Sequence, residues 1–209
     1  MLPMKLSLRP VAALIIAGVV ICPAGQASKR KNPVQQAIDA YQSTNSYIVP
    51  AAGTVEVAFS PNEGSEHPVI KVIDSAKTEL ELLSYSFTSV PVVEALVRAR
   101  HRGVKVTLVA NYKDNVSADR SGKARAALGA LVNAGADVRT ISVYAIHHDK
   151  VIIADRQTVE QGSFNYSDAA AHRNSEDVMV NWGNPQLAAV FLKHFDRNYR
   201  QAAPYSPGY

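Results

Sequence analysis

The chain has 209 residues, of which 47% are hydrophobic and 19% are charged. This length allows one domain with a full hydrophobic core, and the composition excludes a disordered or collagen-like chain. The formal net charge of +4 permits nucleic-acid binding but does not show it, because such a charge is equally typical of a mixed, solvated surface.

Residues 1–27 have the three parts of a secretory signal peptide. The start is basic, residues 11–22 form an uninterrupted apolar run, and Gly25 and Ala27 supply small residues for cleavage. The run is too short for a membrane-spanning helix, which needs about 20 residues, although an uncleaved anchor is the alternative. We expect cleavage after Ala27, export to the periplasm or the medium, and no stable membrane insertion of the mature protein.

Residues 28–53 predict a polar N-terminal extension. The segment opens with the basic cluster 29–31 and ends in Pro50-Ala51-Ala52-Gly53, which is typical of a linker. Cys22, the only cysteine, lies within the signal peptide. The exported protein is therefore expected to contain no disulfide.

From residue 54 to residue 209 the hydrophobic pattern predicts one regular domain. Alternation at Val55, Val57 and Phe59 predicts a first strand. Further strands are expected at 80–87, 104–110, 138–141, 151–153 and 177–182, and helices at 69–77, 92–102, 124–134 and 185–199. The polar segment 111–122 is expected to be a mobile loop. The alternation predicts an α/β domain with a mixed, largely parallel β-sheet flanked by helices.

The residues with chemical potential lie between 148 and 176. His148 and Lys150 are two apart on a predicted strand, so they are expected to project together, with His147 on the other side. An unprotonated histidine can attack phosphorus, and a lysine ammonium can bind phosphate oxygens. Ser163 and Asn165 can donate hydrogen bonds to the same oxygens.

The pattern H-x-K-x4-D-x6-G-S-x-N, from His148 to Asn165, resembles the signature of the phospholipase D superfamily. Residues 54–205 also resemble its small Nuc-type bacterial endonucleases. The resemblance implies a phospholipase D/nuclease-like fold and a covalent phosphohistidine on His148, and it implies that Glu176 orients that histidine. Asp155 belongs to the signature, but a purely structural role at the strand end is also open.

The resemblance further implies a homodimer. Members of the superfamily place two such motifs around one phosphate, whereas this chain has one, so two copies would form one site on their symmetry axis. We expect no metal ion and no cofactor. The scattered histidines show no metal-ligand spacing and are expected to be solvated; they are His67, His101, His172 and His194.

Three functions remain open from the sequence. The first is a non-specific endonuclease on DNA, with RNA as a further substrate, approached along the basic residues Lys113, Arg120, Lys123 and Arg125. The second is a phospholipase D-type lipid phosphodiesterase, which would use the same chemistry. The third is a non-catalytic nucleic-acid-binding module, which the presence of both His148 and Lys150 disfavours.

Overall fold

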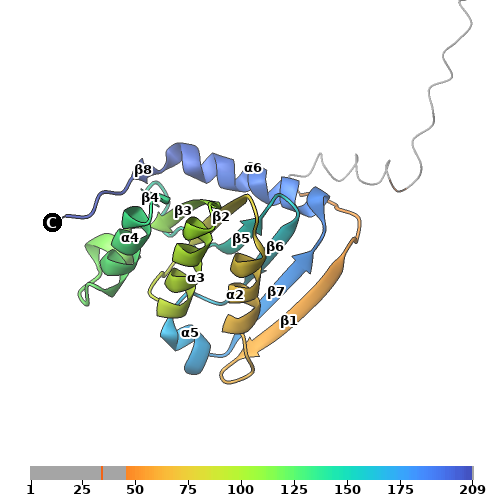
Figure 1. Cartoon of the computed structure of the whole chain (residues 1–209), viewed down its shortest axis with the longest axis horizontal. Helices are drawn as coiled ribbons and strands as arrows, with labels where there is room; N and C mark the ends of the chain where they lie inside the picture. The colour runs from red at the N-terminus through yellow and green to blue at the C-terminus, as the bar shows by residue number, and fades with distance from the viewer. Residues whose placement is uncertain (1–33, 35–45, 209) are drawn as a thin grey trace, which may run out of the picture.

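The computed structural model describes Val34 and residues 46–208. The expected signal peptide and most of the expected extension lie outside the described residues. No helix in the described part is long and apolar enough to cross a membrane. In this part, helices alternate along the chain with the strands of one eight-stranded sheet (Figure 1).

The helices and strands follow the expected order, with four additions, at 113–117, 158–162, 168–172 and 203–204. The strands are β1 (Thr54–Ser60), β2 (Glu79–Ser84), β3 (Lys105–Asn111), β4 (Asp137–Ile141), β5 (Lys150–Ala154), β6 (Thr158–Gly162), β7 (Glu176–Trp182) and β8 (Ala203–Pro204). The helices are α2 (Glu66–Ser75), α3 (Val90–His101), α4 (Lys123–Asn133), α5 (Asp168–His172) and α6 (Pro185–Gln201). A single π-helical turn, η1 (Lys113–Ser117), precedes α4.

The sheet is mixed, as expected, but it is less parallel than expected. Its strand order is β1-β7-β6-β5-β2-β3-β4-β8, and only the pairs β2–β3 and β3–β4 are parallel. Parallel neighbours need a crossover, which α3 and α4 provide. Between β4 and β5 a loop takes the place of a crossover helix, and a tight turn joins β5 directly to β6, so that the chain reverses its direction. Helix α6 later crosses the other face of the sheet, from β7 to β8. The remaining pairs are consequently antiparallel.

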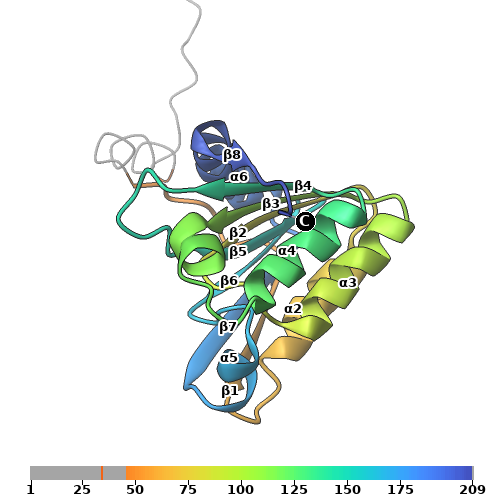
Figure 2. The same cartoon turned by 90° about the vertical axis from the view of Figure 1, so that its left-hand side faces the viewer.

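Both faces of the central strands are covered. Helices α2, α3 and α4 lie on one face and α6 lies on the other (Figure 2). Leu80, Leu82 and Ile152 pack into the first core, and Leu83 and Ile153 pack into the second. This burial on two sides explains why β2 and β5 are apolar runs instead of alternating patterns.

The segment 111–122, expected to be a mobile loop, contains the ordered turn η1. Asn115 in this turn is fully buried. Its Oδ1 accepts a hydrogen bond from Phe87 N (2.9 Å), and its Nδ2 donates to the carbonyl oxygens of Tyr85 (2.6 Å) and Asn111 (2.8 Å). The polar composition of this segment does not predict an ordered turn. Its order comes from the side chain of Asn115, which satisfies backbone groups that β2 and β3 leave open at their ends.

Asp155, in the turn after β5, holds the start of β2. Its backbone has a φ of 50°. Its carboxylate accepts hydrogen bonds from the backbone N–H groups of Lys77 (2.8 Å), Thr78 (2.8 Å) and Glu79 (3.1 Å), and from the Thr78 hydroxyl (2.7 Å). Burial opposes ionisation, but these hydrogen bonds outweigh it and lower the pKa of Asp155.

Replacing Asp155 by Asn should lower the free energy of unfolding at pH 7 by about 1.5 kcal/mol, because the charge-assisted bonds to 77–79 weaken while asparagine still tolerates a positive φ. The lowered pKa means that this stabilisation exists above the carboxyl's unfolded pKa and is lost as the pH falls through the folded one. Urea denaturation at pH 7 and at pH 3 measures both effects. The exposed Asp168→Asn is the control; an equal loss for both variants would contradict the capping role.

Candidate active site

Four strand ends meet at one edge of the sheet. Strands β2 and β6 run toward this edge, whereas β5 and β7 run away from it, because each pair of neighbours is antiparallel. In this register Ser84 at the end of β2 pairs with Lys150 at the start of β5. Gly162 at the end of β6 likewise pairs with Val178 near the start of β7. Segments separated in sequence by more than 60 residues thus converge on one place.

His148 and Lys150 lie at the start of β5. His148 precedes the strand and is exposed, whereas Lys150 is its first residue and only 5% exposed. The Nζ of Lys150 donates a hydrogen bond to the backbone oxygen of His148 (2.9 Å). Tyr85, just after β2, lies beside both: its ring centroid is 4.7 Å from that of His148 and 5.1 Å from the Nζ of Lys150. The ring of Tyr85 therefore packs beside both residues and connects them to the end of β2.

The ammonium of Lys150 is poorly hydrated. Burial lowers its pKa, and the nearby carboxylates of Glu176, Asp149 and Asp114 oppose that shift. A cation in such a place interacts more strongly with an arriving anion than a fully solvated lysine does. The site is therefore suited to a phosphate group.

Ser163 and Glu176 face each other across β6 and β7. The Ser163 hydroxyl donates to Oε2 of Glu176 (2.6 Å) and accepts from Asp177 N (3.0 Å), and Asn174 Nδ2 donates to Oε1 of Glu176 (2.9 Å). Gly162 allows this close approach, since a Cβ there would lie 2.2 Å from the backbone oxygen of Asp177. Between Glu176 and the His148 ring no hydrogen bond is found among the described residues. The orienting role expected of Glu176 stays a prediction.

Asn165 ends the same turn as Ser163. It is half-buried, and its Oδ1 has no hydrogen-bond partner within residues 46–208. The structure thus places His148, Lys150, Ser163, Asn165 and Glu176 on strand ends and turns at one edge of the sheet.

Asp155 is not brought to this edge. It lies beyond the other end of β5, where its backbone N–H donates to the oxygen of Glu79 at the start of β2. A strand of five residues, about 16 Å long, separates it from His148. The assignment of Asp155 to the catalytic residues is corrected accordingly: it is a structural carboxylate, the alternative that the sequence left open.

One group at the site was missed by sequence reasoning. The Oδ2 of Asp149 lies 3.3 Å from Nδ1 of His147 and 3.1 Å from Nε2 of His194, and Arg197 contacts Nδ1 of His194 at 2.9 Å. His194 is therefore half-buried and paired, not solvated as expected. These contacts tie the histidine-bearing loop to α6, and no sequence spacing could reveal a pair 45 residues apart.

His147 and His148 have opposite environments, as expected for neighbours that project in different directions. His147 is 2% exposed. Burial lowers its pKa, against the opposing charge of Asp149, so its ring is held neutral in the interior. The exposed His148 is the histidine available to a substrate.

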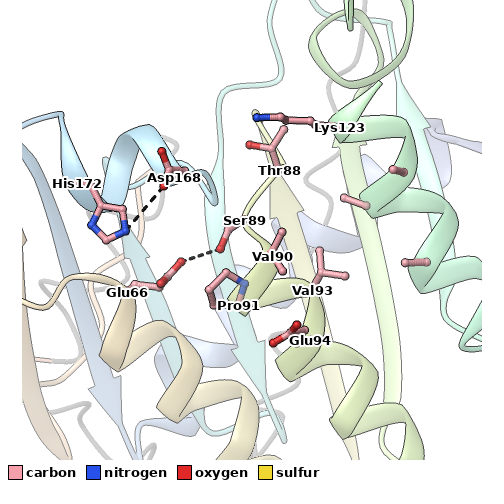
Figure 3. Close-up of a pocket in the computed structure, with 13 residues that line it drawn as sticks. Glu66, Thr88, Ser89, Val90, Pro91, Val93, Glu94, Lys123, Asp168 and His172 are labelled. Atoms are coloured by element: carbon pink, nitrogen blue, oxygen red, sulfur yellow. Dashed lines mark hydrogen bonds and ion pairs between the residues drawn. The ribbon is translucent and has the colours of Figure 1, made fainter. Parts of the chain in front are cut away.

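Two further features concern the titratable side chains and a cavity outside this edge. In the described part of the chain, no group of three or more His, Cys, Asp or Glu side chains is placed to hold a metal ion. A cavity of about 690 Å³ lies between α3, α4 and α5 and is lined by neither His148 nor Lys150 (Figure 3). Three carboxylates line it, from Glu66, Glu94 and Asp168, together with the basic side chains of Lys123 and His172. Because the carboxylates outnumber the lysine, the cavity is less favourable for a phosphate group than the strand-end edge.

Comparison with known proteins agrees with this geometry. Residues 69–199 match the family described as "Cardiolipin synthase, PLD-like domain". The structure is similar to the crystal structure of Nuc, a phospholipase D family member from Salmonella typhimurium, with a TM-score of 0.70 and 41% identity, covering 73% of this chain and 97% of that one. NucT from Helicobacter pylori has the same fold at 21% identity, with a TM-score of 0.64 and coverage of 73% and 99%.

Curated relatives carry two kinds of lipid-related name. A protein named phospholipase D from Rickettsia felis is 34% identical over 144 residues, which cover 68% of this chain and 67% of that protein. A mitochondrial cardiolipin hydrolase from Mus musculus is 26% identical over 143 residues, covering 68% and 62%. The convergence of His148, Lys150, Ser163 and Asn165 at one edge, on a fold shared with Nuc, leads to one conclusion. The chain belongs to the phospholipase D superfamily and is a hydrolase of phosphodiester bonds.

Proposed function

We propose that this protein is a metal-independent, non-specific endonuclease that cleaves DNA, with RNA as a further substrate. The observation that carries the proposal is the open strand-end edge, where the exposed His148 stands beside the buried ammonium of Lys150. Phosphate recognition of this kind reads the backbone and carries no base information, which fits low sequence specificity. The predicted signal peptide supports action outside the cytoplasm.

The proposed reaction has two steps at one phosphorus atom. An imidazole nitrogen of His148 attacks phosphorus and forms an N–P bond, while the bond from phosphorus to the leaving oxygen breaks. The same histidine of a second copy gives its proton to the leaving oxygen and then takes one from a water molecule. That water attacks phosphorus, breaks the N–P bond and frees His148. Lys150, Ser163 and Asn165 are proposed to stabilise the negative charge on the phosphate oxygens.

Basic side chains beside the edge favour a polyanionic substrate. Three of them are exposed next to the end of β3: Lys113 begins η1, Lys123 begins α4, and Arg120 lies between the two. Arg125 has a structural role, because its NH1 donates to the backbone oxygens of Val116 (3.1 Å) and Asp119 (2.7 Å) and so holds this turn together. We propose that the first three bind phosphates flanking the scissile bond.

A lipid phosphodiester is the second candidate. The names of the curated relatives favour it. Exposed apolar side chains next to His148, namely Val143 and Ile146, could contact a lipid surface. The chemistry at phosphorus would be the same, so the substrate has to be determined by experiment.

The same apolar side chains support a homodimer. Val143 is 58% and Ile146 56% exposed in a single chain, and Tyr112 and Tyr144 are also exposed. The segment 143–146 leads directly into His148, so a second copy that covered it would bring two His148 side chains toward one axis. We propose this arrangement because each chain supplies one His148, and the two-step reaction needs two such histidines.

The variant His148→Ala should lose at least about 10³-fold in kcat, since no other group can form the covalent intermediate. Plasmid nicking in excess EDTA by residues 28–209 is the measurement. His172→Ala, which removes an exposed histidine outside the site, should retain full activity. Nicking by His148→Ala at the wild-type rate would remove the central assignment. Release of a head group from phospholipid vesicles, with no nicking by either protein, would favour the lipid substrate.

Replacing Lys113 or Arg120 by Ala should weaken binding of the inactive His148→Ala protein to DNA at every sequence tested. Each replacement should also reduce the slope of log K against log salt by about 0.9, the value for one phosphate contact. Fluorescence anisotropy between 50 and 200 mM salt measures this. Lys105→Ala is the control, because Lys105 starts β3 at the opposite edge. An unchanged slope in both site variants would exclude them from the DNA path.

The double variant Val143→Asp, Ile146→Asp should be monomeric and inactive, because two buried like charges at each side of the axis oppose association. Sedimentation velocity gives the oligomeric state, and circular dichroism controls for folding. A monomeric protein with wild-type nicking activity would contradict the shared site. A dimer that persists in the variant would place the interface elsewhere.

A further inference from the structure

A buried acid lies behind the active edge and takes no part in the proposed reaction. Glu160, on β6, is fully buried, between Ile152 of β5 and Val180 of β7. Its Oε2 accepts a hydrogen bond from the Tyr166 hydroxyl (2.8 Å), and its Oε1 has no partner within the described residues. Burial raises the pKa of Glu160 to about 8, although the bond from Tyr166 opposes this shift. The carboxyl is therefore neutral below that pH.

Among residues 46–208, no cation compensates for the buried position of Glu160, since only burial and the Tyr166 hydroxyl shift its pKa. Helix α2 packs over this part of the sheet and presents Val69, Val72 and Ile73 to the core. Of its charged residues, Lys71 pairs with Glu56 and Asp74 with Arg98 at the surface, and Glu66 accepts a hydrogen bond from the Ser89 hydroxyl (2.6 Å). The titratable group that faces Glu160 from the turn after β6 is the phenol of Tyr166.

The pair Glu160–Tyr166 encloses the Gly162–Asn165 turn. Glu160 stands two residues before Gly162, and Tyr166 follows Asn165 directly. The ring of Tyr166 is itself fully buried, with its edge against Phe87 (6.2 Å between centroids) and Phe164 (6.4 Å). The hydrogen bond between their side chains thus joins the two ends of the loop that carries Ser163.

Tyr166 also holds the segment that carries Tyr85. Its backbone oxygen accepts hydrogen bonds from the N–H groups of Thr88 and Ser89, both at 2.8 Å. Through this segment it is connected to Tyr85, whose ring contacts His148. The two elements that flank the nucleophile therefore share one buried anchor.

We propose that Glu160 is a positioning residue for phosphodiester hydrolysis: through Tyr166 its buried carboxyl fixes Ser163 and Tyr85 relative to His148. It touches no substrate. The proposal rests on the phosphodiesterase activity of the site and not on whether the substrate is DNA or lipid. The alternative is a purely structural pair, which would affect stability but leave the turnover of folded molecules unchanged.

The test compares three variants in the full mature protein. Glu160→Gln keeps the shape and the acceptor but cannot ionise, Tyr166→Phe removes only the hydroxyl, and Glu160→Met removes both polar atoms. Bis(p-nitrophenyl) phosphate serves as a substrate without DNA or lipid, and plasmid nicking runs in parallel. Circular dichroism at the assay temperature verifies that each variant is folded.

At pH 6.5 we expect Tyr166→Phe and Glu160→Met to lose about tenfold or more in kcat with little change in KM, and Glu160→Gln to retain kcat within about twofold. At pH 9 the wild type should lose activity as Glu160 ionises in the apolar core, whereas Glu160→Gln should lose less. The matched control is Glu81→Gln: Glu81 is also buried, and burial raises its pKa to about 7, but it belongs to β2 under α6. Its replacement should leave kcat unchanged.

Folded Tyr166→Phe and Glu160→Met proteins with wild-type kcat would overturn the proposal and leave a structural pair. Equal alkaline loss in the wild type and in Glu160→Gln would also count against it. If all variants follow the expected pattern with bis(p-nitrophenyl) phosphate but no protein nicks DNA, the endonuclease assignment fails while the role of Glu160 stands.

Discussion

The site depends on the antiparallel insertion of β5 between β2 and β6. This arrangement places the start of β5 beside the end of β2, so that Lys150 pairs with Ser84 and Tyr85 reaches His148. The same alternation brings the end of β6 beside the start of β7, and with it Ser163 beside Glu176. If these strands were parallel, the two halves of the motif would lie at opposite edges of the sheet.

His148, the proposed nucleophile, stands on a loop, and contacts on several sides restrict that loop. Asp149 links it to His194 of α6 on one face of the sheet. On the other side, Asn115 holds the backbone of Tyr85 and Phe87. An exposed histidine can thus keep a defined position, which is a condition for attack on a phosphorus atom. The proposed nucleophile is accessible, whereas Lys150 beside it and the side chain of Asn115 are buried.

Charge distribution separates the active edge from the rest of the surface. The buried ammonium of Lys150 and the exposed side chains of Lys113, Arg120 and Lys123 make this edge favourable for an anion. The cavity between α3, α4 and α5, in contrast, is lined mainly by carboxylates among its charged side chains. The exposed apolar segment 143–146 is part of two proposals, because either a second copy of the chain or a lipid surface would cover it. Sedimentation and vesicle assays address these two occupants separately.

The sequence by itself determined the family, the class of reaction and most of the secondary structure. The spacing from His148 to Asn165 and the apolar runs of β2 and β5 are local properties, and local patterns of this kind survive any arrangement of the elements. The mixed sheet was predicted correctly, but the share of parallel strand pairs was overestimated, because short apolar strands have the same pattern in parallel and antiparallel pairs.

Only the tertiary structure decided which motif residues meet. Asp155 is within seven residues of His148 in sequence but lies at the far end of β5, whereas His194 is distant in sequence and shares a carboxylate with His147. The buried pair Glu160–Tyr166 likewise became visible only in the core, since an acid on a strand usually faces water. The physical reason is that a strand separates near neighbours by about 3.3 Å per residue, while sheet pairing joins segments without regard to their separation along the chain.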